Sequence, residues 1–199
     1  MERRQALKNI GLAAGFFVVT PSILTLMQSC KSDVAKWVPE FLTIDQSVAL
    51  LNIVDVILPK TEGLPSATEV NVPEFIDKYL NEVLDDEDQG NVKVAFDTII
   101  SILKPDNEAS WDTVTIEDYK GLLDKHMLLK GETDEERLAN PASLIPTKSE
   151  FLNNLKWMTI NAYTTTEQIG ENVLIYDPIP SQYFCGDLQE LTGGKSFSL

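Results

Sequence analysis

Residues 43–59, TIDQSVALLNIVDVILP, decide the fold. Thr43, followed three residues later by Gln46, is a capping box, the pattern that begins a helix. Apolar residues then recur at spacings of three and four and form an unusually wide stripe: Ile44, Val48, Leu50, Leu51, Ile53, Val54, Ile57 and Leu58. A helix with so much apolar surface needs neighbours on several sides, which predicts a central position. Pro59 ends the helix.

The same two signals predict the helices that follow. Asn71 is placed to cap a helix with Pro73 in its first turn and the stripe Phe75, Ile76, Tyr79, Leu80, Val83 and Leu84. An acidic run, residues 85–88, lacks the ligand alternation and closing glutamate of an EF-hand loop, so we interpret it as a solvated turn. The turn caps a helix over residues 87–103, with five inward residues: Val92, Ala95, Phe96, Ile99 and Leu103.

The second half of the chain continues in this manner. Thr115 opens a helix with Ile116, Tyr119, Leu122, Leu123, His126 and Met127 on one face. A short helix is expected over residues 134–138, and Thr147 with Glu150 caps a long helix that contains Phe151, Leu155, Met158 and Ala162, with Trp157 and Tyr163 as further aromatic bulk. Alternation typical of strands is scarce. We therefore predict an all-α domain of about six helices over residues 43–170.

Charge limits the partners that this chain can have. Its 199 residues hold 16 basic and 31 acidic side chains, for a net charge of −15. Residues 1–29 contain three basic residues and one acidic residue, so the remainder carries −17. Such a charge repels phosphate backbones and argues against binding to nucleic acid, but it permits a basic protein partner.

The first 29 residues have the anatomy of a signal peptide: a basic start, a short apolar stretch and a small residue before the end. A membrane-spanning helix is the alternative. Arg3 and Arg4, followed by Leu7 and Lys8, resemble the twin-arginine export motif. That route carries folded proteins, often with a cofactor bound, so a chain without a cofactor motif is expected to travel with a partner that holds one.

The signal ends in Leu-Met-Gln-Ser-Cys, which resembles a lipobox with Met27 and Ser29 at the positions that matter. The resemblance implies that Cys30 is acylated and becomes the first mature residue, followed by a tether over residues 30–42. Two or more acyl chains give a stable anchor. We therefore expect an exported lipoprotein on the periplasmic side of a membrane. A cysteine that is clipped away, or left as a free thiol, is the alternative.

The sequence offers few residues that could bind a metal ion or a haem. The chain has two cysteines and one histidine, without the local clustering of a zinc site or the C-x-x-C-H motif of a c-type haem. It has no G-x-G-x-x-G after a strand, no Walker A motif and no G-x-S-x-G. We predict that the chain binds no cofactor, has no metal site and has no catalytic residues.

Residues 171–199 break the helical pattern. Two prolines, several aromatic residues and a cysteine follow one another in an expected extended coil: Tyr176, Pro178, Pro180, Tyr183, Phe184 and Cys185. Either the coil wraps its own domain or it is a docking surface for a partner, since aromatic side chains are poorly suited to water. For Cys185 three states remain open: a buried thiol, a free reactive thiol, or an intermolecular disulfide.

These features together resemble the gluconate 2-dehydrogenase subunit 3 family. The resemblance rests on the twin-arginine start, the helix ending Ile57-Leu58-Pro59, the sequence VPEFID at residues 72–77, and the Tyr-Asp-Pro-x-Pro element with Tyr183 and Gly186. It implies a small, non-catalytic subunit that aids export and maturation of a large flavoprotein of the glucose-methanol-choline type. FAD would be in that partner, which oxidises a sugar or polyol, and a cytochrome c subunit often takes the electrons.

Two other functions compete with this one. An independent membrane-anchored lipoprotein would be a helical module for ligand binding or scaffolding, with a pocket of its own and no partner dehydrogenase. A hydrolase would use Cys185 with His126, but about 59 residues separate them and no third orienting residue is indicated. On an apolar helix face, His126 is more simply interpreted as a half-buried structural residue.

Overall fold

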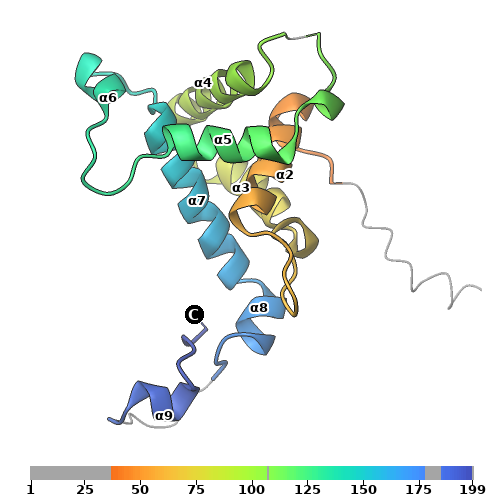
Figure 1. The fold of residues 1–199 in the computed structure, drawn as a ribbon, viewed down its shortest axis with the longest axis vertical. Coiled ribbons are helices and arrows are strands. Elements are labelled where there is room, and N and C mark those ends of the chain that lie inside the picture. The colour runs from red at the N-terminus through yellow and green to blue at the C-terminus, as the bar shows by residue number, and fades with distance from the viewer. Residues whose placement is uncertain (1–36, 107, 178–184, 199) are drawn as a thin grey trace, which may run out of the picture. The chain divides into compact units, whose positions relative to one another are not determined.

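The computed structural model describes residues 37–106, 108–177 and 185–198. The chain divides into two units, Met1–Val38 and Pro39–Leu199, and nearly all described residues belong to the second. Eight α-helices form its described part: α2 (Ile44–Ile57), α3 (Val72–Glu82), α4 (Asp86–Leu103), α5 (Ile116–His126), α6 (Glu135–Ala139), α7 (Lys148–Thr164), α8 (Glu167–Asn172) and α9 (Leu188–Thr192). Two short 3₁₀ helices, Thr68–Val70 and Trp111–Thr113, precede α3 and α5 (Figure 1).

Helix α2 is the centre of the domain, as its wide apolar stripe predicts. The capping box is present, with the Thr43 side chain accepting from the Gln46 amide and the Gln46 side chain accepting from the Thr43 amide. Leu50, Ile53 and Val54 are fully buried, and α2 packs against α3, α4, α5 and α7. The all-α prediction is therefore confirmed, with a core built around the helix that begins the domain.

The surrounding helices begin where their caps predict. The side chains of Asp85, Thr115 and Thr147 each accept a hydrogen bond from the backbone three residues later, in the first turns of α4, α5 and α7. These helices pack large buried side chains against α2. The ring of Phe96 on α4 meets the ring of Phe151 on α7 edge to face, with centroids 4.8 Å apart. Such aromatic pairs stabilise a core beyond the area that they bury.

A buried carboxylate fixes the chain just before α2. Asp77 of α3 is fully buried, and its two oxygens accept from the backbone amides of Glu40 (2.7 Å), Phe41 (3.2 Å) and Leu42 (2.9 Å). The side chains of Phe41 and Leu42 are buried as well, and the Lys93 ammonium of α4 lies 4.3 Å from the Phe41 ring centroid. The last three residues of the predicted tether are therefore part of the domain.

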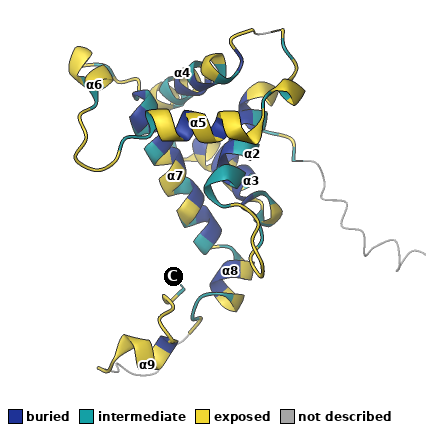
Figure 2. Cartoon of the chain, in the orientation of Figure 1, coloured by how far each residue is buried: buried dark blue, intermediate teal, exposed yellow. Residues whose placement is uncertain are grey.

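The structure differs from the sequence analysis in two further local features. Asn71 precedes α3 without a side-chain cap; it adopts a left-handed backbone conformation with φ 60°, which asparagine tolerates better than most residues. The predicted C-terminal coil contains the end of α8 and the whole of α9, which Asp187 caps and Gly193 ends. Both helices are short, and most of α9 is exposed (Figure 2).

Candidate functional site

The predicted docking segment is only partly described. Tyr176 is half exposed and Cys185 is exposed, whereas Pro178, Pro180, Tyr183 and Phe184 lie outside the described residues. The signal residues Arg3 and Arg4 and the lipidation residue Cys30 also lie outside them. An exposed Cys185 does not fit the alternative of a thiol packed under its own domain.

Backbone hydrogen bonds join the two ends of this segment. The Ile175 amide donates to the Ser196 carbonyl (3.0 Å), and the Ser198 amide donates to the Ile175 carbonyl (2.8 Å). These bonds form a single parallel bridge between Ile175 and Phe197. Ile175, three residues after the end of α8, and the described residues 196–198 therefore lie side by side.

The two residues of the hydrolase hypothesis are not brought together. His126 ends α5 close to Lys148, the first residue of α7, and burial, with Lys125 and Lys148 nearby, lowers the pKa of its imidazole. Cys185 lies just before α9, beyond the opposite end of α7 (Figure 1), and α7 has 17 residues and is therefore about 25 Å long. The geometry gives this pair no shared site.

An apolar groove between α3 and α7 is the site that the sequence analysis missed. Two adjoining hollows of about 370 and 180 Å³ share Tyr79, Trp157 and Met158 as lining residues. Phe75, Tyr79 and Trp157 border the groove and are 55%, 36% and 64% exposed. The Phe75 and Tyr79 rings are stacked on one another, with centroids 6.5 Å apart. We call this site the α3–α7 groove.

The groove exists because the apolar stripe of α3 is wider than the surface that covers it. Ile76 and Leu80 are buried, but Phe75, Tyr79 and Val83 lie on the flank and are exposed. Trp157 similarly projects from α7 while Phe151, Leu152 and Leu155 of the same helix are buried. The spacing in the sequence identified these residues as apolar helix positions but could not show that none of the described elements packs over them. Clustered exposed aromatic residues are typical of interaction sites.

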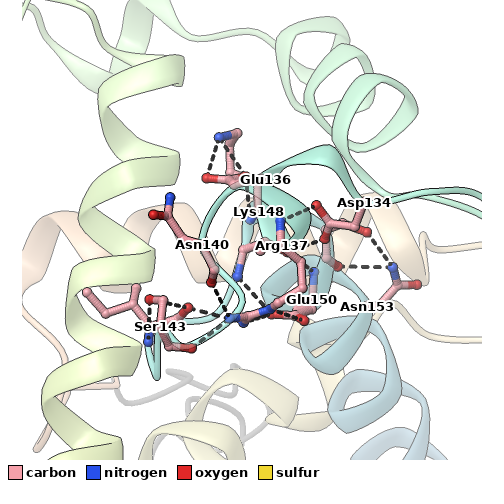
Figure 3. A network of polar contacts seen from close by, with 11 residues as sticks. Asp134, Glu136, Arg137, Asn140, Ser143, Lys148, Glu150 and Asn153 are labelled. Atoms are coloured by element: carbon pink, nitrogen blue, oxygen red, sulfur yellow. Dashed lines mark hydrogen bonds and ion pairs between the residues drawn. The ribbon is translucent and has the colours of Figure 1, made fainter.

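A second depression, of about 590 Å³, is polar and open. Arg137 of α6 occupies one side of it (Figure 3), where its guanidinium donates to both carboxylate oxygens of Glu150 and to the carbonyls of Ser143 (2.6 Å) and Ile145 (3.3 Å). The Thr147 hydroxyl donates to Asp134 (2.5 Å), and Lys148 pairs with Glu136. These contacts tie the segment between α5 and α7 to the first turn of α7, so we assign them a structural role.

We expect Arg137→Ala to loosen that segment without unfolding the domain. Because the ion pair is partly exposed, the loss of unfolding free energy should be about 1 kcal/mol, while amide exchange over residues 134–146 should rise clearly. The Arg137 guanidinium holds the pKa of the Glu150 carboxyl below its usual range. The difference from wild type should therefore persist at neutral pH and shrink below about pH 4.3, where unfolded glutamates take up protons. Lys156→Ala, an exposed cation on α7, is the control; equal exchange rates in both variants would contradict this role.

The described residues contain neither a cluster of possible metal ligands nor a helix that could span a membrane. No three histidine, cysteine, aspartate or glutamate side chains there are grouped so as to hold a metal ion. None of the helices in that part of the chain has the length and apolar character needed to cross a bilayer.

Comparison with known proteins gives one match. The model of the gluconate 2-dehydrogenase subunit 3 family matches residues 44–180, which is more than half of the chain and includes both walls of the α3–α7 groove. No curated protein and no solved structure matches the chain.

Proposed function

The chain belongs to the gluconate 2-dehydrogenase subunit 3 family, and from this we propose that it is the non-catalytic accessory subunit of an exported, flavin-dependent dehydrogenase. The family description makes it a subunit of a dehydrogenase complex. In our proposal the catalytic partner is a large flavoprotein of the glucose-methanol-choline type that oxidises a sugar or polyol, and a cytochrome c subunit accepts the electrons. The small subunit aids export and maturation of the flavoprotein and attaches it to the membrane.

The family match carries this proposal, and three features of the chain support it. The twin-arginine motif at Arg3 and Arg4 is suited to export of a folded complex, and the lipobox at Cys30 to membrane attachment. Within the described residues, the α3–α7 groove exposes aromatic side chains that a partner can cover. Docking through the segment around Tyr176 and Cys185 remains part of the proposal.

The decisive experiment is purification of the tagged full chain from solubilised native membranes. We expect a flavoprotein in equimolar amount, with the absorption bands of bound flavin and dye reduction driven by a sugar or polyol. A chain purified alone, with a ligand in its own pocket, would instead favour the independent lipoprotein.

We also expect the chain, when produced without its partner, to be colourless and inactive. It has no sequence motif for pyrophosphate or haem binding, so it should show no flavin or haem absorption band and should reduce no dye with sugars or polyols. Adding free FAD is the control and should change neither result. Stoichiometric bound flavin in the isolated chain would contradict the assignment of the flavin to the partner.

A further inference from the structure

We propose that the α3–α7 groove binds an amphipathic helix of the partner subunit, and that basic residues flank this helix at the end that meets the start of α4. The inference rests on the proposed function, because it takes another subunit of the complex as the source of the helix. It adds the surface, the secondary structure of the bound segment and the end of that segment that carries basic residues.

The length of the groove suits about two and a half to four turns of helix. On one side its lining runs from Phe75 of α3 to Leu84, two residues past the end of that helix, which is nine residue steps and so about 14 Å. On the other side it runs from Phe151 of α7 to the cap residue Thr165, which is fourteen steps and so about 21 Å. A ligand helix would therefore place apolar anchors at spacings of three and four against Tyr79 and Trp157.

The walls of the groove favour a helix over an extended segment. Most of the lining lies on α3, α4 and α7, whose backbone groups are satisfied within each helix, and Leu144 and Pro146 add a short non-helical edge. Among the described residues no strand lines the groove, so an extended chain finds no strand edge there to bond with. A peptide that buries its backbone must satisfy its own amides and carbonyls. A helix does this internally, and only its side chains need to match the apolar surface.

Charge sets which end of the ligand is basic. Of the described residues that line the two hollows, Asp88 alone is charged. Asp88 lies in the first turn of α4 together with Asp86 and Glu87, and Asp85 caps this helix. All four residues are exposed. The positive end of the helix dipole offsets only about half of one charge. The opposite end of the groove is neutral, with Asn161 and Thr165.

The same charges disfavour the other occupants. A second copy of the chain carries the same net charge of −15 and the same acidic turn, so two copies repel one another. A bilayer with anionic headgroups is repelled for the same reason. A basic, apolar protein segment is the occupant that satisfies both the aromatic lining and the carboxylates.

Photo-crosslinking in the intact complex tests this proposal directly. The full chain is produced in its native membrane with p-benzoylphenylalanine in place of Trp157, irradiated, purified and digested for peptide mapping. We expect a crosslink to a flavoprotein segment with helical apolar spacing and Lys or Arg at one end. As a control, p-benzoylphenylalanine is placed at Ile116, which is exposed on α5. This variant should not crosslink to that segment.

Variants give a second, independent measurement. Tyr79→Ala with Trp157→Ala should lower affinity for the flavoprotein at least about tenfold, and Asp86→Lys with Glu87→Lys should slow association, most clearly at low salt. Leu138→Ala and Asp124→Lys, exposed residues on α6 and α5, are the matched controls. Unchanged far-ultraviolet circular dichroism and urea midpoints establish that each variant folds.

The outcomes separate the two proposals. A crosslink to an acidic segment, to a second copy or to lipid, or unchanged affinity in the groove variants, overturns the groove assignment while the accessory role stands. Absence of any flavoprotein with the wild-type chain overturns both.

Discussion

Asp77→Ala is expected to lower the free energy of unfolding by about 3 kcal/mol, the largest stability effect of an exchange at a polar side chain that we predict. Asp77 is fully buried and accepts three backbone amides, those of Glu40, Phe41 and Leu42. Removing the carboxylate leaves three donors without their acceptor. Each such donor costs about 1–3 kcal/mol where water cannot replace the bond.

Asp77→Asn should fall between wild type and Asp77→Ala. One carboxylate oxygen accepts from both Phe41 and Leu42, and the amide oxygen of asparagine can keep that position. The amide nitrogen would then face the Glu40 amide, which is itself a donor, so one bond is lost. The expected order of stability is therefore wild type, asparagine, alanine.

Urea unfolding of the purified chain, followed by far-ultraviolet circular dichroism, measures these differences. Asp124→Ala, an exposed carboxylate on α5, is the matched control and should change stability by less than about 0.5 kcal/mol. If Asp77→Ala were as mild as this control, the three hydrogen bonds would not hold the entry to α2. Faster amide exchange at Phe41 and Leu42 should accompany the loss.

The sequence predicts the features that local spacing controls. Capping boxes join residues three positions apart, so Thr43, Thr115 and Thr147 could be identified as helix starts without knowledge of the fold. The wide stripe of α2 predicted its central position, because a helix with so much apolar surface needs several neighbours.

Features that depend on distant partners could not be predicted in this way. Asp77 bonds to residues 35–37 positions earlier in the chain, and on α3 it looked like any polar residue of an amphipathic helix. Gln46 was identified as half of a capping box, yet its amide nitrogen also donates to Asp97 of α4 (2.8 Å). Each role exists only once the helices have packed.

The α3–α7 groove also could not be predicted from the sequence, because the spacing of apolar residues does not show which of them stay exposed. Periodicity identifies Phe75, Tyr79 and Trp157 as apolar positions, but coverage depends on which helices pack nearby. Neighbours cover the inner row of α3, and the flank stays exposed. An apolar residue that the sequence assigns to a core can therefore belong to a binding surface.

The second large effect is expected at the amino terminus, where Cys30→Ala should move the chain from the membrane fraction to the soluble fraction almost completely. The proposal rests on the lipobox formed with Met27 and Ser29. Each buried methylene contributes about 0.8 kcal/mol to membrane binding, so loss of two or more acyl chains removes far more binding energy than any surface contact replaces. Fractionation, together with metabolic labelling by a palmitate analogue, measures the change.

Cys185→Ala is the matched control, because Cys185 is the other cysteine of the chain and is exposed. It should remain in the membrane fraction and keep the label. The location of the flavoprotein provides a second measurement. If the chain attaches the flavoprotein to the membrane, Cys30→Ala should release both proteins together, still bound to one another. Labelled protein in the Cys30→Ala variant, or a variant as firmly bound as wild type, would show that the anchor is elsewhere. Release of the small chain alone would show that the flavoprotein has an attachment of its own.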